Sequence, residues 1–258
     1  MRLTEKIRRG WDVSAKGFSD LVQEDFREEN RLAWLEVILE GQEGGAPPRI
    51  LDVGTGPGFF AAILAGEGFS VTGIDISPMM LEQARENAEQ YGSAPEFMLM
   101  DSEAPDFPEE SFDLIVSRNV VWSLKNPGGA YAAWRRLLRP KGRLVVFDGD
   151  YLRDLRDPEF AAACGKTQKE YERIFGEKRK VSYASYEEAR GWREELPLVR
   201  EERPAWDIRV LREIGYSGIN CDAVNDRVFL DAKSRFAHRD QPLFRITAEK
   251  GGIKDWTV

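Results

Sequence analysis

The sequence predicts an α/β fold, with helices on both faces of a mostly parallel sheet. Short apolar runs alternate with amphipathic segments of helical length, the pattern of successive strand–helix–strand units. The first run passes through a glycine-dense turn, residues 54–58, into an apolar helical segment. The first three runs each carry an aspartate at or near their end. These features together favour a sheet whose strand ends gather polar side chains at one edge.

Length and composition limit the possible classes of protein. The chain has 258 residues, which suits one large domain or a domain with a small insertion. Its net charge of −8 disfavours nucleic acid as the main partner. No apolar run approaches the roughly 20 residues that span a bilayer, and no secretory signal is visible. Cys164 and Cys221 are far apart, so we expect reduced thiols in a cytoplasmic protein, and His238 lies in a polar stretch typical of the surface.

The N-terminal segment is predicted to be helical from about Trp11 to Glu40, because apolar residues recur there at helical spacing. Residues 41–48, rich in glycine and proline, end this pattern. The part from Asn30 onward should pack on the sheet. The part that contains Trp11 and Phe18 either folds over a ligand or simply packs on the core.

The stretch Ile50–Phe60 is expected to form a strand, a tight loop and the start of a helix. Gly54, Gly56 and Gly58 allow positive φ angles and a close approach of a ligand to the backbone. The start of the helix presents unpaired N–H groups to that ligand. The spacing is neither the dinucleotide fingerprint, since the third glycine comes one residue early, nor a phosphate-binding loop of the Gly-Lys-Ser/Thr type.

The next two strands, Phe69–Asp75 and Pro95–Asp101, each end in an acid. Asp75 lies about 20 residues beyond Gly54, where an acid at the end of the second strand can accept hydrogen bonds from a ribose diol. Asp101 and Ser102 could meet an adenine amine. The alternative for both aspartates is an ordinary capping or loop acid. Between these strands, Ser77 and Pro78 should begin a helix as N-cap and first residue.

A fourth strand, Phe112–Ser117, is followed by a helix at 127–138 and a fifth strand at 143–147. Parallel strands present their carboxyl ends at one edge, so the residues after these strands should lie near the reaction. The candidates are Arg118, Asn119, Trp122, Asp148 and Tyr151.

The remaining chain suggests an insertion and a final strand pair. Residues 152–203 are highly charged with scattered aromatics and are expected to form helices, one near Tyr171–Phe175 and one over 183–192. A helix from Pro204 to Ile214, a strand at 219–224 and a last strand at 243–248 follow, the strands joined as a hairpin. The predicted organisation is an N-terminal helical segment and partial cap (1–48), a core (49–151 and 204–258) and a helical insertion over the acceptor site (152–203).

These motifs in this order resemble the class I S-adenosylmethionine (SAM)-dependent methyltransferases, most closely the ubiquinone/menaquinone-biosynthesis-type branch. Leu51–Gly58 resembles their motif I, Phe112–Ser117 their motif IV, and Leu137–Leu144 the turn before the fifth strand, with Lys141 where glycine is usual. The resemblance implies a Rossmann-like sheet of seven strands in the order 3-2-1-4-5-7-6, with strand seven antiparallel.

The resemblance also implies where SAM, and its product S-adenosylhomocysteine, would bind. The glycine loop would receive the methionine moiety, Asp75 the ribose, Asp101 and Ser102 the adenine, and Asp52 would orient the loop or meet the ammonium. The complete set implied for the cofactor is Asp52, Gly54, Thr55, Gly56, Gly58, Asp75, Ile76, Met80, Asp101, Ser102, Ser117 and Arg118.

The expected reaction is in-line methyl transfer to a small molecule, without a metal, by a monomer or homodimer. A base is needed only for a nucleophile that arrives protonated. Asp148, Asp150 and Tyr151 are the candidates, while Trp122 and the aromatics of 152–203 either wall the acceptor or pack in the core. Two other functions stay open: a SAM-binding regulator without turnover, and an NAD-dependent dehydrogenase.

Overall fold

The computed structural model describes residues 1–42, 47–178 and 191–251. Seven strands form one sheet in the order β3-β2-β1-β4-β5-β7-β6, which confirms the predicted topology. The strands are β1 (Arg49–Val53), β2 (Ser70–Asp75), β3 (Glu96–Leu99), β4 (Phe112–Arg118), β5 (Leu138–Asp148), β6 (Tyr216–Ala223) and β7 (Phe244–Lys250). Strands β1 to β5 pair in parallel, whereas β7 is antiparallel to both β5 and β6.

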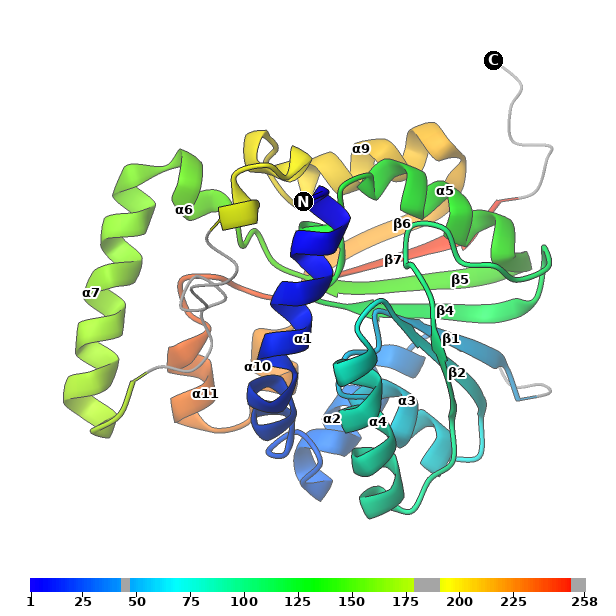
Figure 1. Cartoon of the computed structure of the whole chain (residues 1–258), viewed down its shortest axis with the longest axis horizontal. Helices are drawn as coiled ribbons and strands as arrows, with labels where there is room; N and C mark the ends of the chain where they lie inside the picture. The colour runs from blue at the N-terminus through cyan, green and yellow to red at the C-terminus, as the bar shows by residue number, and fades with distance from the viewer. Residues whose placement is uncertain (43–46, 179–190, 252–258) are drawn as a thin grey trace.

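The helices lie on both faces of this sheet (Figure 1). They are α1 (Leu3–Val22), α2 (Glu28–Leu39), α3 (Phe59–Gly66), α4 (Pro78–Tyr91), α5 (Pro127–Leu137), α6 (Arg153–Arg156), α7 (Pro158–Phe175), α9 (Ala205–Ile214), α10 (Asn225–Val228) and α11 (Ala232–Ala237), with 3₁₀ turns at Val121–Ser123 and Pro197–Arg200. The N-terminal segment is two helices, and the first begins at Leu3, before the expected start near Trp11. Helix α7 stands away from the sheet, beside α11 (Figure 1).

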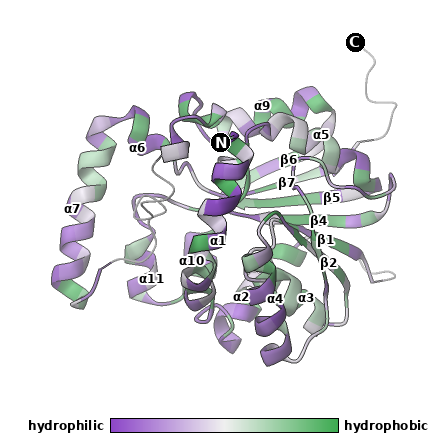
Figure 2. Cartoon of the chain, in the orientation of Figure 1, coloured by the Kyte–Doolittle hydropathy of each residue, from purple (hydrophilic) through white to green (hydrophobic). Residues whose placement is uncertain are grey.

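Alternate residues of the inner strands face opposite sides of the sheet, as strand geometry requires. Leu51 and Ile115 belong to the core beneath α5, whereas Ile50 and Leu114 belong to the core beneath α2 and α3. Both faces of these strands are buried, which explains their continuous apolar sequence and their green colour in Figure 2. Among the described residues, no helix is long and apolar enough to cross a membrane.

The start of β5 differs from the expectation of a separate turn before a strand at Arg143. Leu138 already pairs with Phe112, and Arg143 pairs with Leu114, so the residues between them form an irregularity within the strand. Lys141 adopts a φ of 63° there, the left-handed conformation usually given to glycine. Lysine therefore occupies the glycine position of the motif at some cost in backbone strain.

The connection from β6 to β7 is longer and more structured than the short link expected of a hairpin. It contains α10 and α11 before the chain returns antiparallel along β6. The predicted helix over 183–192 falls mostly outside the described residues. The other helix expected in the insertion, near Tyr171–Phe175, is the C-terminal part of α7.

Candidate functional site

The glycine loop lies at the carboxyl end of β1 and is packed so tightly that two of its positions, Gly54 and Gly58, have no room for a side chain. Gly54 and Gly58 have φ angles of 64° and 81°. A Cβ on Gly54 would lie 2.3 Å from Cγ2 of Val120, and one on Gly58 would lie 2.8 Å from Cβ of Ala84. The loop is thus held between the segment after β4 and helix α4, and glycine is required at both positions because the neighbouring side chains leave no room for a Cβ.

Asp52 fastens this loop to the start of α3. Its buried carboxylate accepts a hydrogen bond of 2.6 Å from the Thr55 hydroxyl and one of 3.1 Å from the Ala61 N–H. Burial raises the pKa of Asp52 to about 7, against the lowering effect of these hydrogen bonds. The arrangement fits the loop-orienting role expected from the sequence.

Asp75 joins the end of β2 to the same loop. Its two carboxylate oxygens accept hydrogen bonds from the N–H groups of Ser77, at 2.8 Å, and Gly56, at 2.9 Å. Burial raises its pKa to about 6. Each carboxylate oxygen has a further lone pair, so Asp75 retains acceptor capacity for a ligand.

A cavity of about 1120 Å³ extends from this loop toward α1, α2 and the connection before β7. It brings together most of the residues expected to bind a cofactor. Those in its wall are Asp52, Gly54, Thr55, Gly56, Asp75, Ile76, Met80, Asp101, Ser102 and Arg118. Gly58 and Ser117 are not in the wall; Gly58 is the N-cap of α3, and Ser117 is fully buried in β4.

Helix α1 covers one side of the cavity and is tied to helix α4 and the glycine loop. Asn87 donates hydrogen bonds to the Pro57 carbonyl, at 2.8 Å, and to the Ser19 hydroxyl, at 3.1 Å. The Ser77 hydroxyl donates to Asp12 at 2.6 Å. Trp11 and Phe18 lie in the cavity wall with their rings edge to face, and Trp11 also packs on the core residue Trp122. Trp11 and Phe18 therefore pack on the core, one of the two alternatives left open by the sequence, and also line the cavity; a contact with a ligand stays a prediction.

Arg118 and Asp25 close the cavity between β4 and the turn that follows α1. Their ion pair measures 2.8 Å, and both side chains are partly buried. The Arg118 guanidinium also lies 4.3 Å from the centre of the Trp34 ring, a cation–π geometry. Of the residues proposed to act on the acceptor, Arg118 and Asn119 line the cavity.

Trp122, Asp148 and Tyr151 do not line it, and Trp122 and Tyr151 instead support the wall. The Trp122 indole donates to the Asn119 carbonyl at 2.9 Å, and the Tyr151 hydroxyl donates to the Asn119 side-chain oxygen at 2.8 Å. Trp122 is also stacked on Trp192 in the core. The aromatic wall suggested for Trp122 is thus core packing that positions Asn119.

Asp148 is buried in an ion-pair network away from the cavity wall. Arg203 lies 2.9 Å from Asp148 and 2.7 Å from Asp207, and all three side chains are at most 1% exposed. Burial raises the pKa of Asp148, although the Arg203 charge opposes this. Asp150 is likewise engaged, in an ion pair with Arg156. A group paired in this way is poorly placed to take a proton from an acceptor.

His238 is a wall residue that sequence reasoning placed on the surface. It lines the cavity together with Phe229, on which its ring is stacked with 3.7 Å between ring centroids. The sequence feature that could have predicted this position is the apolar run Val228–Leu230 inside an otherwise polar connection, because such a run indicates that the connection packs against the core.

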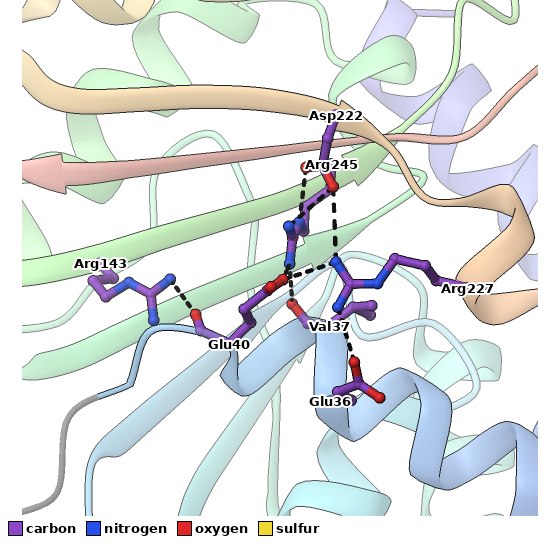
Figure 3. A network of polar contacts seen from close by, with 7 residues as sticks. All are labelled: Glu36, Val37, Glu40, Arg143, Asp222, Arg227 and Arg245. Atoms are coloured by element: carbon purple, nitrogen blue, oxygen red, sulfur yellow. Dashed lines mark hydrogen bonds and ion pairs between the residues drawn. The ribbon is translucent and has the colours of Figure 1, made fainter.

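A polar network at the far end of α2 holds two walls of the cavity together (Figure 3). Arg245 of β7 donates two hydrogen bonds of 3.0 Å to Asp222 and one of 2.9 Å to the Val37 carbonyl, and also pairs with Glu40. Arg227 of α10 pairs with Glu40 at 2.8 Å. The network fixes α2 against α10, the helix that precedes the Phe229–His238 wall.

Comparisons with known proteins agree with this geometry. Residues 51–146 match the family model described as "Methyltransferase domain". Aklanonic acid methyltransferase DauC of Streptomyces sp. strain C5 is 33% identical over 145 residues, 55% of this chain and 64% of that protein. Demethylmenaquinone methyltransferase of Thermus thermophilus is 39% identical over 123 residues, 45% of this chain and 54% of that protein. The chain thus covers less than two thirds of these relatives.

Solved structures share the fold over most of the chain. A SAM-dependent methyltransferase from Aquifex aeolicus gives a TM-score of 0.56 at 17% identity, covering 92% of this chain and 97% of that one. A phosphoethanolamine N-methyltransferase from Haemonchus contortus gives 0.65 at 17% identity, covering 98% and 61%. The matched domain, the seven-stranded topology and the relatives agree: residues 51–146 of this chain match the methyltransferase domain family, and the chain has the fold of solved methyltransferases.

Proposed function

We propose that the protein binds SAM at the glycine loop and transfers its methyl group to a small-molecule acceptor held in the same cavity. The observation that carries this proposal is the loop Gly54–Gly58, held by Asp52 and Asp75 at the wall of a cavity of about 1120 Å³. Pockets for drug-sized ligands are commonly about 300–1,000 Å³, so this space is large enough for more than a cofactor.

The chemistry of the residues in the cavity wall supports SAM as the cofactor. Gly54, Thr55 and Gly56 of the loop line the cavity, where they would receive the methionine moiety. Asp75 keeps lone pairs for the ribose hydroxyls, and Asp101 with Ser102 would take the adenine. Ile76 and Met80 supply apolar wall, and the main chain at Arg118, which lines the cavity, would serve the ammonium.

Bound SAM supplies a methyl carbon that its sulfonium has already activated. The protein's contribution is then positioning and exclusion of water, which can account for about 7–11 kcal/mol of the barrier. Helix α1 and the Arg118–Asp25 pair cover the cavity and would shield it from solvent. Asn119, held by Trp122 and Tyr151, would orient the acceptor.

We further propose a cytoplasmic monomer or homodimer that acts on a small molecule rather than on nucleic acid. The net charge of −8 supports this choice of partner. In the proposed organisation, residues 1–48 form a partial cap, 49–151 with 204–258 form the core, and 152–203 form a helical insertion over the acceptor site.

Two measurements test the function. Calorimetric titration should show binding of S-adenosylhomocysteine and none of NAD, and the reverse result would favour a dehydrogenase. Methyl-tritiated SAM should then label small molecules in an extract of the source organism. Binding of S-adenosylhomocysteine without any transfer would point to a regulator instead.

A further inference from the structure

Asn119, which follows β4 and lines the cavity, has a left-handed backbone conformation with a φ of 59°. Such an angle is uncommon outside glycine, although asparagine tolerates it better than most residues. Neighbouring segments impose this conformation, because the Asn119 N–H donates to the Phe147 carbonyl at 2.8 Å and its carbonyl accepts from the Trp122 indole at 2.9 Å. Residues held in this way cluster at ligand sites.

Asn119 lies directly beside the glycine loop. Ser117, two residues earlier, pairs with Val53, the last residue of β1 before the loop. Val120, the next residue, lies so close to the loop that a Cβ on Gly54 would be 2.3 Å from its Cγ2. Asn119 stands between these two contacts, so the part of the cavity wall that it forms adjoins the loop.

The side-chain amide of Asn119 has one group left for a ligand. Its Oδ1 accepts a hydrogen bond of 2.8 Å from the Tyr151 hydroxyl, which sets the orientation of the amide. No described residue accepts a hydrogen bond from Nδ2, and Nδ2 is not among the buried polar atoms that lack a partner. An amide nitrogen only donates, so Asn119 offers hydrogen-bond donors to the cavity.

A donor in this place selects the kind of atom that can receive a methyl group. An oxygen nucleophile can accept a hydrogen bond with one lone pair and attack the methyl carbon with another. An amine nitrogen has a single lone pair and cannot do both. Sulfur is a weak acceptor, and a carbon nucleophile offers no comparable acceptor. The free amide nitrogen therefore favours oxygen.

The charged groups near the loop leave room for an anionic oxygen. Asp52 accepts a hydrogen bond from the start of α3, and Asp75 accepts one from the loop. Asp25 pairs with Arg118 at 2.8 Å, and the Arg118 guanidinium lines the same cavity. A hydrogen bond from an amide to an oxyanion also favours the ionised form of an acidic oxygen.

We propose that Asn119 binds the reacting oxygen of the acceptor through Nδ2, and that the acceptor is a carboxylic acid or an acidic hydroxyl compound such as a phenol. This inference rests on the proposed methyl transfer. The acceptor binds as an oxyanion, having given its proton to solvent. The oxygen forms its bond to the methyl carbon as the carbon–sulfur bond breaks, and the electron pair of that bond goes to sulfur. The oxyanion and sulfonium charges cancel, and the product is a methyl ester or ether.

The chemistry of the labelled product tests the choice of atom. Methyl-tritiated SAM is incubated with the protein and a deproteinised extract of the source organism, whose thiols have been alkylated with iodoacetamide. Hot hydriodic acid cleaves O-methyl groups to volatile methyl iodide, whereas N-methyl and C-methyl groups survive the same treatment. Most of the label should be released as methyl iodide. Label that stays in the residue, or transfer that is lost on alkylation of the thiols, would overturn the inference.

The role of Nδ2 is tested by comparing Asn119→Asp with Asn126→Asp. Aspartate keeps an oxygen for Tyr151 and tolerates the left-handed backbone, but it has no donor. Asn126 is the exposed N-cap of α5, outside the cavity wall, where aspartate caps equally well. The amount of extract that gives half-maximal transfer should rise about 10- to 150-fold in Asn119→Asp, the effect of losing a hydrogen bond to a charged group. It should stay near wild type in Asn126→Asp.

A second variant, Asn119→Gly, separates loss of the donor from the added charge. Glycine accepts the left-handed backbone without steric cost, so this variant should fold and should also need more extract for half-maximal transfer. Calorimetric affinity for S-adenosylhomocysteine should match wild type in every variant. A large loss of that affinity in Asn119→Gly would assign the side chain to the cofactor and overturn the inference.

The outcomes distinguish this inference from the proposed function. Half-maximal transfer at the same amount of extract in wild type, Asn119→Asp and Asn119→Gly overturns the role of Asn119 alone. Absence of transfer by the wild type, despite binding of S-adenosylhomocysteine, overturns the function and the inference together.

Discussion

Replacement of Asp75 by Asn tests the link between the glycine loop and the cofactor. The carboxylate accepts the Ser77 N–H at 2.8 Å and the Gly56 N–H at 2.9 Å, one on each oxygen. An amide has one oxygen, so one of these N–H groups loses its acceptor and meets an NH₂ group instead. An unsatisfied buried group costs about 1–3 kcal/mol, and the ribose also loses a charged acceptor.

The expected result is an affinity for S-adenosylhomocysteine lower by about 1–3 kcal/mol, which corresponds to about 5- to 150-fold in Kd. Calorimetric titration measures the affinity, and urea denaturation shows whether the variant is folded. Asp106→Asn is the matched control, because this aspartate is exposed and outside the cavity wall. A folded Asp75→Asn variant whose Kd stays within about twofold of wild type would refute the ribose assignment.

Three further predictions concern the same scaffold. Burial raises the folded-state pKa of Asp52 to about 7 from an ordinary value of 3.8, so its contribution to stability is present below about pH 4 and lost as pH rises to 7; the urea midpoint should fall between about pH 4 and 7, and a fall of the same size in Asp52→Asn would contradict this. Arg203→Met leaves Asp148 and Asp207 buried without their cation and should lower the free energy of unfolding by about 3–5 kcal/mol, which a urea midpoint close to wild type would exclude. Gly54→Ala should abolish binding of S-adenosylhomocysteine through its clash with Val120, and the double variant with Val120→Ala should recover part of it in calorimetry; an unaffected single variant would show that the loop has room for a side chain.

The alternation of apolar strands and amphipathic helices was sufficient to predict the parallel sheet, and the resemblance carried by the motifs supplied its strand order. The glycine spacing and the strand-end acids predicted where Asp52 and Asp75 lie, because local geometry places residues after parallel strands at one edge. The start of β5 was harder to predict. Its irregular pairing with β4 depends on how Leu138 and Arg143 meet their partner strand, which local sequence does not specify.

The same limit applies to side chains whose role depends on distant segments. Trp122 and Asp148 follow the correct strands, but Trp192 and Arg203, far along the chain, draw them into the core. Their positions after strands were predictable, whereas their partners were not. A position after a parallel strand therefore does not by itself place a side chain in the cavity wall.

The sequence by itself determined the parallel sheet, the glycine loop and the acids around it, because these depend on hydrophobic periodicity and on backbone conformations that particular residues allow. Only the tertiary structure decided which side chains line the cavity. His238 reaches the cavity because β7 returns antiparallel beside β5 and Asn225 fixes the connection before it. Contacts between segments so far apart in the chain are set by packing of the whole molecule, and no local pattern records them.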